Sequence, residues 1–156
     1  MGRAISYIIP SPALGFGLAG LLPFFAGALA CWISPEVISQ PFKLDGATVL
    51  CTYGAIILSF LGGIRWGVAM HHQDMIQSWK VVGWAMVPSL LGWFALFVPT
   101  KLGLPLLLIG FVLQFIIDYR STKAGVTAPW FLRLRTMLTV GATLSIGVGW
   151  LGVLVY

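Results

Sequence analysis

Two residues of opposite charge interrupt the apolar stretches of this sequence, and their positions favour an ion pair. Arg65 lies about six residues inside one end of an apolar segment (47–70), roughly 9 Å deep at the helical rise of about 1.5 Å per residue. Asp118 directly follows another apolar segment (102–117). A charge at that depth in lipid is costly unless it is paired, hydrated or able to reach the interface. The sequence therefore predicts that Asp118 meets Arg65 or, failing that, Arg135.

A polar amide, Gln114, is expected to share a helix face with Asp118. Gly110, Gln114 and Asp118 follow one another at helical i, i+4 spacing, and we predict that this face points into a helical bundle. The alternative is that the charged side chains extend to the interface without touching. A structural ion pair is favoured over proton transfer, which needs a chain of titratable groups across the bilayer. The opposite half offers only Glu36 and Asp45 near its surface.

Histidine and serine residues do not form a recognisable catalytic or metal site in the sequence. His71 and His72 are adjacent, so on a helix they point about 100° apart. No third metal ligand is spaced to join them, and we interpret both as interfacial loop residues. Neither Ser59 nor Ser89 has a histidine or carboxylate nearby in sequence. We therefore assign no catalytic residue, metal or cofactor, and we expect no enzymatic activity.

Small residues recur at every fourth position in two of the apolar segments. The first series consists of Cys51, Ala55, Ser59, Gly63 and Gly67. The second series consists of Gly141, Ser145 and Gly149. Such residues let helix backbones approach closely, and the resulting van der Waals contact replaces the hydrophobic drive that lipid cannot supply. We predict that both segments are central packing helices, with lining of a small pore as the lesser alternative.

The two cysteines fall near the same ends of neighbouring apolar segments. Cys31 and Cys51 are interpreted as small apolar packing residues. A disulfide between them is the alternative if that side of the membrane is oxidising.

The elements that must position these residues are membrane-spanning helices. The chain has 156 residues, of which 59% are hydrophobic and 8% charged, whereas soluble domains contain about 25% charged residues. Seven Trp and ten Phe suit anchoring at both lipid interfaces. We predict one all-α domain, a polytopic bundle of about five transmembrane helices. Their predicted bounds are 13–33, 47–70, 81–98, 102–117 and 137–155.

The distribution of basic residues predicts the orientation of the bundle. With five spans, one side would carry Arg3, Lys80, Arg120, Lys123, Arg133 and Arg135, and the other side Lys43 and Lys101. The positive-inside rule then places the N-terminus inside and the C-terminus outside. The net charge of +5 is scattered over helix ends, so no basic face is available to follow a nucleic-acid backbone. We expect the lipid bilayer as a partner and no nucleic acid.

The stretch 118–135 is the largest polar segment, and its second half mixes rings, leucines and arginines. We predict that Trp130, Arg133 and Arg135 lie in the membrane interface, as does Trp66, with Pro129 near a first helical turn. The alternative is a solvated loop with one anchoring tryptophan. Two further prolines, Pro23 and Pro88, lie inside spans and are expected to kink their helices, because each removes a backbone hydrogen bond.

Four stretches of the sequence resemble a family of proteobacterial and mitochondrial multi-span membrane proteins. The family includes transmembrane protein 69 and is catalogued as a domain of unknown function. The longest stretch runs from Tyr53 to Gly67. The others are 14–24, 87–90 and the pair of segments 129–131 and 134–139. The resemblance covers nearly the whole chain. It implies a multi-pass protein of the bacterial inner membrane or of mitochondria, and it supplies no activity or catalytic residue.

Three functional hypotheses follow from these features. The first is a non-enzymatic accessory or assembly factor of a larger membrane complex, with a respiratory complex as the candidate and with other membrane proteins or self-association as partners. The second is a small-solute or ion transporter or channel. The third is a lipid- or quinone-binding protein with a lateral groove, in which Trp66 and Trp130 lie at the headgroup level.

Overall fold

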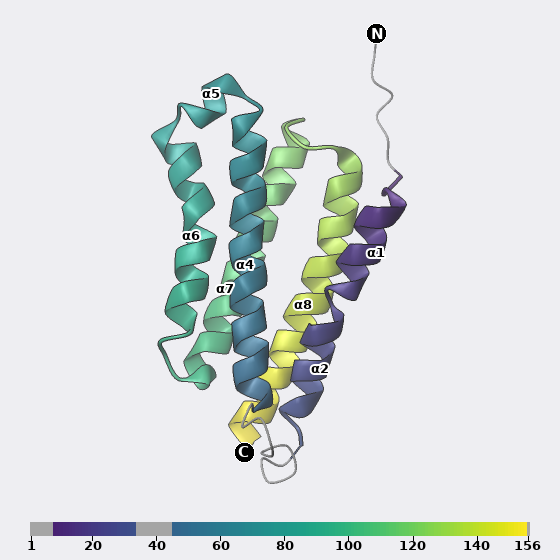
Figure 1. Cartoon of the computed structure of the whole chain (residues 1–156), viewed down its shortest axis with the longest axis vertical. Coiled ribbons are helices and arrows are strands. Elements are labelled where there is room, and N and C mark those ends of the chain that lie inside the picture. The colour runs from purple at the N-terminus through teal and green to yellow at the C-terminus, as the bar shows by residue number, and fades with distance from the viewer. Residues whose placement is uncertain (1–7, 34–44, 156) are drawn as a thin grey trace.

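The computed structural model describes residues 8–33 and 45–155, and every regular element in these ranges is a helix. Long helices run side by side and form an elongated bundle (Figure 1). The elements are α1 (Ser11–Ala19), α2 (Leu22–Ala30), α4 (Gly46–Met70), α5 (Gln73–Ile76), α6 (Trp79–Ala95), α7 (Thr100–Lys123) and α8 (Pro129–Val155). The all-α fold is therefore confirmed.

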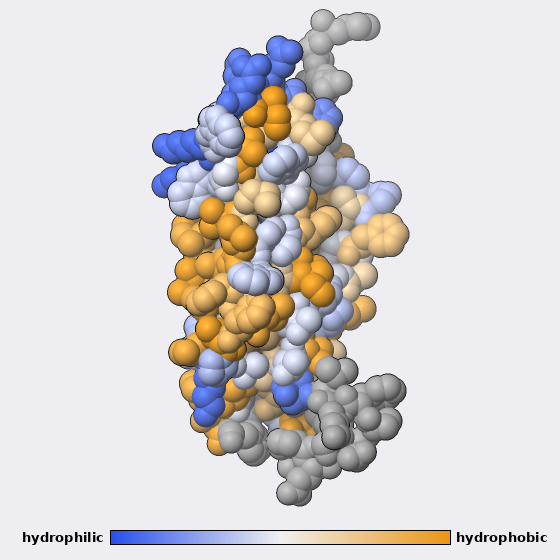
Figure 2. Space-filling model, turned by 60° about the vertical axis from the view of Figure 1, so that its left-hand side comes forward, coloured by the Kyte–Doolittle hydropathy of each residue, from blue (hydrophilic) through white to orange (hydrophobic). Residues whose placement is uncertain are grey.

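The bundle has the length and surface expected of a membrane protein. Within the described ranges, four segments are long and apolar enough to cross a membrane: Ser11–Ala30, Gly46–Met70, Thr100–Lys123 and Pro129–Val155. The helix that would make a fifth crossing is α6, which has 17 residues and runs beside α4 over most of its length (Figure 1). Hydrophobic residues cover the middle of the visible face, and hydrophilic residues gather towards its two ends (Figure 2). About five crossings are consistent with this arrangement.

The first predicted span is broken into two helices, as the position of Pro23 led us to expect. α1 ends at Ala19 and α2 begins at Leu22, with Pro23 in the first turn of α2, where the missing N–H costs least. Between them the N–H of Leu21 donates to the carbonyl oxygen of Leu18 at 3.0 Å, a tightened turn. As a result α2 packs on both α4 and α8, whereas α1 packs on α8.

α4 is the central helix and contacts α2, α6, α7 and α8. Asp45 caps its N-terminus: one carboxylate oxygen accepts from the Thr48 backbone N–H at 2.6 Å, and the other accepts from the Thr48 hydroxyl at 2.9 Å. The fully buried side chains around α4 include Phe24, Leu50, Leu58, Leu104, Leu107, Phe111 and Ile146. In lipid their contribution is mainly close packing, because the surrounding acyl chains are equally apolar.

The close contact between α4 and α6 uses glycines next to the predicted ones. A Cβ at Gly62 would lie 2.6 Å from the carbonyl oxygen of Ala85 in α6. Gly63 and Gly67, which were predicted to pack, have no neighbouring atom within 4 Å of the position that a Cβ would occupy, and Ser59 is half-buried on the same side of the helix. The prediction was wrong for Gly63 and Gly67 because a strict four-residue spacing advances by about 40° per step around a helix of 3.6 residues per turn. The series begins at the buried Cys51 and Ala55 and has left the packed face by Gly63.

The small residues of α8 do lie against other helices. An added Cβ at Gly141 would meet the side chain of Leu21, and one at Gly149 would meet Leu50. Ser145, between them, is buried and donates its hydroxyl to the Gly141 carbonyl at 2.8 Å. α8 is therefore held close to both α2 and α4.

Two helices are longer than predicted. α7 continues to Lys123, beyond the predicted end at 117, and α8 begins at Pro129, before the predicted start at 137. The polar stretch 118–135 is therefore largely helical. Only a short turn joins the two helices, and Gly125 in it adopts φ +74°, a conformation that favours glycine. This tight hairpin brings the polar ends of α7 and α8 together.

Candidate functional site: a buried ion pair and its neighbours

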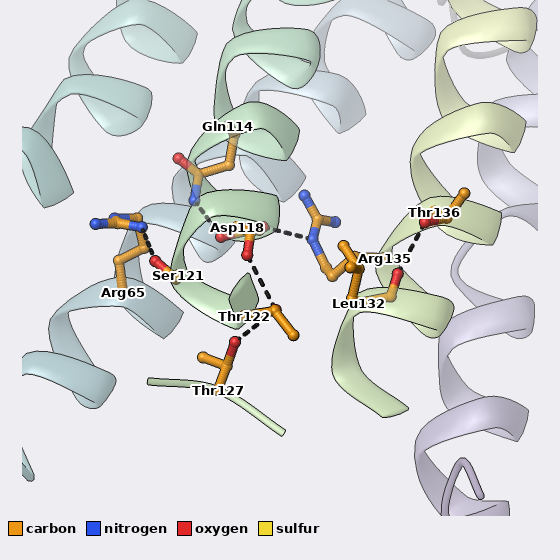
Figure 3. A network of polar contacts seen from close by, with 9 residues as sticks. All are labelled: Arg65, Gln114, Asp118, Ser121, Thr122, Thr127, Leu132, Arg135 and Thr136. Atoms are coloured by element: carbon orange, nitrogen blue, oxygen red, sulfur yellow. Dashed lines mark hydrogen bonds and ion pairs between the residues drawn. The ribbon is translucent and has the colours of Figure 1, made fainter. Parts of the chain in front are cut away.

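Asp118 and Arg135 form a buried ion pair between α7 and α8. The Arg135 Nε donates to Asp118 Oδ2 at 2.7 Å. The side chain of Asp118 is 6% exposed and that of Arg135 is 5% exposed. Asp118 lies near the end of α7, and Arg135 lies in the second turn of α8, so the hairpin brings them face to face. Figure 3 shows the terminal nitrogens of Arg135 pointing away from the carboxylate.

The second carboxylate oxygen of Asp118 is also occupied. Gln114, one turn earlier on α7, donates from its Nε2 to Asp118 Oδ1 at 3.2 Å. The predicted face of α7 is thus buried, with Gln114 and Asp118 only 1% and 4% exposed as whole residues. Thr122 donates to the backbone carbonyl of Asp118 at 3.0 Å and shares a 2.7 Å hydrogen bond with Thr127 (Figure 3). These bonds fix the turn that follows.

Arg65 does not form the ion pair that was our first prediction. Its Nη1 donates to the hydroxyl of Ser121 at 3.2 Å, about one helical turn beyond Asp118 on α7. Arg135 and Gln114 bond to the two carboxylate oxygens of Asp118, while Arg65 is directed at Ser121, about one turn further along α7. The partner that the sequence offered as second choice, Arg135, takes the place of Arg65.

The three charged groups do not balance within this cluster. Arg65 and Arg135 contribute two positive charges and Asp118 one negative charge, which leaves a net charge of +1. Four buried polar atoms have no hydrogen-bond partner among the described residues: Arg65 Nε, Gln114 Oε1, Arg135 Nη2 and Thr139 Oγ1. Buried polar atoms are normally satisfied, so four unpartnered atoms make this an unusual part of the bundle interior.

A lateral cavity lies beside Arg135. It has a volume of about 130 Å³ and is walled by α1, α2, α4, α7 and α8. Trp66 and Trp130, which our third hypothesis placed beside such a groove, are not among the described residues that line it. Trp66 is 38% exposed on α4, and Trp130 stacks edge-to-face on Phe131 at the start of α8.

The other candidate residues lie apart from the cluster. Arg133 is exposed on α8, and His71 and His72 are exposed where α4 ends, with His71 Nδ1 2.8 Å from the Gly67 carbonyl. Cys31 and Cys51 are buried free thiols, each within hydrogen-bond distance of a backbone carbonyl. No group of three metal-binding side chains occurs in the part of the chain that the structure describes.

Sequence reasoning missed Ser121, Thr122 and Thr127 as parts of the cluster. The predicted end of the helix at 117 placed all three in a loop, where their directions could not be assigned. The signal that was available is their spacing: Ser121 and Thr122 follow Asp118 at i+3 and i+4, which are the neighbouring positions on a continuing helix.

Comparison with known proteins identifies a family for this bundle. Residues 9–151 match a family described as "Protein of unknown function (DUF3429)". The chain belongs to this family. Among similar proteins, Transmembrane protein 69 of Xenopus tropicalis is 35% identical over 142 residues, and Transmembrane protein 69 of Mus musculus is 30% identical over 144 residues. This confirms the resemblance carried by the sequence motifs.

The coverage of these relatives is unequal. The matched residues make up 88% and 90% of this chain but 53% and 57% of the frog and mouse proteins. The chain thus spans just over half the length of the relatives that it matches. No solved structure matches the chain. Family membership and the apolar helices together establish a transmembrane protein.

Proposed function

We propose that this family member is a non-enzymatic accessory or assembly factor that binds other membrane proteins in a bacterial inner membrane. The observation that supports this role is the small-residue side of α4, where Gly63 is exposed and Gly67 is half-buried. Gly63 and Gly67 both have open space where a Cβ would lie, although they recur at the helical spacing of close helix contacts. The backbone of a partner helix can therefore approach α4 closely at these two positions.

The proposed partner is a larger complex, and a respiratory complex is the first candidate. The support is an association: the family resemblance implies both proteobacterial and mitochondrial members, and respiratory complexes are shared by both membranes. Fold similarity alone does not define function, so the partner has to be identified directly.

Quantitative mass spectrometry after gentle solubilisation, at native expression level, tests the proposal. We expect a partner membrane protein to be recovered in constant ratio with the wild-type chain. Gly147→Phe is the control and should recover the same partner, because Gly147 also has open space beside it but lies on another helix, α8. Gly63→Phe should lose the partner while keeping the same helix content. Equal recovery of all proteins with Gly63→Phe, or no specific partner with the wild type, would contradict the proposal.

A further inference from the structure

The break between α1 and α2 leaves an apolar groove on the side of the bundle. α2 packs on α4, but α1 packs on α8, so the space between α1 and α4 is not filled by helix contact. The cavity of about 130 Å³ lies there, with Phe16 of α1, Phe60 of α4 and Leu138 of α8 among its walls and Phe111 of α7 at its base. Phe16 is 81% exposed and Phe60 63% exposed at the membrane surface.

One charged side chain contributes to this groove among the described lining residues, namely Arg135. Arg135 is 4% exposed, and its Nε donates to Asp118. Its Nη2 has no protein partner among the described residues. The groove therefore combines apolar walls with one arginine side chain, whose guanidinium N–H groups bind oxygen acceptors strongly because the interaction is charge-assisted.

The charge and depth of the cluster favour an anionic ligand. Asp118 pairs with Arg135, and Arg65, which bonds to Ser121 and is not among the described residues that line the groove, adds one further positive charge to the cluster. Arg135 is the seventh residue of α8, which is about 9 Å from the start of the helix at 1.5 Å per residue. For a helix that begins at the interface, a charge at that depth is costly unless it is compensated, and an anionic ligand would compensate it.

The volume limits the size of the bound part. Sites that enclose a drug-sized molecule measure about 300–1,000 Å³. A cavity of about 130 Å³ can therefore enclose only the part of one hydrocarbon chain that is next to its headgroup. The remainder of such a chain would stay in the bilayer along Phe16 and Phe60.

We propose that the groove binds a single-chain lipid with an anionic headgroup, whose acid oxygens accept a hydrogen bond from the Arg135 guanidinium and whose chain lies between α1 and α4. The ligand class is defined by chemistry: a carboxylate or a phosphate monoester on one long hydrocarbon chain. This binding site is independent of the proposed accessory role, because it faces the groove between α1 and α4 and uses neither Gly63 nor Gly67.

Photolabelling of the full chain in phosphatidylcholine nanodiscs tests the site. The probe is palmitic acid with a diazirine in its chain, and the labelled peptides are mapped by mass spectrometry. Labels should concentrate on groove peptides that contain Phe16, Phe60 or Leu138. Oleate or lysophosphatidate should displace the probe at least about tenfold better than oleyl alcohol, as a charge-assisted hydrogen bond requires. Whichever of the two acids competes better identifies the headgroup.

Matched variants separate the site from general lipid contact. Ile57→Trp fills the groove and should abolish specific labelling, whereas Ile56→Trp, on the adjacent outward position, should not. The double variant Asp118→Asn with Arg135→Gln removes both charges of the pair and should lose the preference for acids. Arg120→Gln, which removes an exposed charge on α7, should keep that preference. Equal displacement by oleyl alcohol, labels spread over all helices, or unchanged acid preference in the double variant would overturn the proposal.

Discussion

The indole N–H of Trp150 in α8 donates a hydrogen bond of 2.9 Å to the backbone carbonyl oxygen of Lys101 in α7. This carbonyl is four residues before Pro105, which lies inside α7. Proline has no N–H, so it cannot donate the helical hydrogen bond that this carbonyl would otherwise accept. The side chain of a neighbouring helix thus satisfies a backbone group that a proline leaves open, as membrane helices require.

Replacement of Trp150 by phenylalanine is therefore expected to destabilise the bundle. Hydrogen bonds between membrane helices contribute about 0.6 kcal/mol on average and up to about 1.7 kcal/mol, and we expect a loss in that range for Trp150→Phe. The loss should shrink in a Pro105→Ala background, because the introduced alanine supplies an N–H to the Lys101 carbonyl. Reversible unfolding in mixed micelles, followed by circular dichroism, measures both values. An identical loss in the two backgrounds would show that the hydrogen bond to Lys101 does not account for it.

The buried pair of Asp118 and Arg135 should show strong energetic coupling. Removing one partner of a buried pair leaves an uncompensated charge and costs about 3–5 kcal/mol, so Asp118→Asn and Arg135→Gln are each expected to be severely destabilising. The double variant should cost much less than the sum, because no charge of the pair is left alone. The coupling of Asp118 with Arg65 should be smaller, since Arg65 bonds to Ser121 instead. A double-mutant cycle in mixed micelles that gives additive losses for Asp118 and Arg135 would argue against the pair.

Two adjacent glycines of α4 provide a sharp contrast. Gly62→Ala would place a Cβ 2.6 Å from the Ala85 carbonyl oxygen, so α4 and α6 must move apart. Overpacking of this kind costs about 1–3 kcal/mol. Gly63→Ala meets no atom within 4 Å and should be neutral or stabilise the helix by about 0.5–1 kcal/mol. The free energies of unfolding of the two variants are directly comparable. Equal effects would mean that the packed face of α4 is not the one described.

The orientation can be tested by cysteine labelling from each side of the membrane. In a background without Cys31 and Cys51, His72→Cys and Lys123→Cys should react with an impermeant maleimide only after the cytoplasmic side is opened. Lys101→Cys, at the other end of the bundle, should react in intact spheroplasts. The expectation rests on the larger number of basic residues at the first end. The reverse pattern of labelling would show an inverted protein.

Much of this architecture could be predicted because lipid makes strict demands on a sequence. Apolar length and the scarcity of charge are sufficient to define the spans, and Pro23 marks the break between α1 and α2. The ends of α7 and α8 were harder to place, because polar residues such as Ser121 and Arg133 can occupy either an interfacial helix or a loop. Hydropathy does not distinguish these two states.

The partners of charged residues were less predictable than the spans. The choice between Arg65 and Arg135 for Asp118 depends on how far α8 extends before its apolar part and on how the hairpin turns at Gly125. A one-residue rotation of α4 likewise decides whether Gly62 or Gly63 packs against α6. Such rotations come from the combined packing of several helices and cannot be read from the spacing of one segment.

The mass of the particle that contains this chain in native membranes is the most direct test of the proposed role. The chain is 16.9 kDa. Extraction into polymer nanodiscs without detergent, followed by mass determination and protein identification, should yield a larger particle in which a second membrane protein occurs in fixed ratio. Particles that hold only this chain and lipid, at native expression level, would contradict the account of an accessory protein.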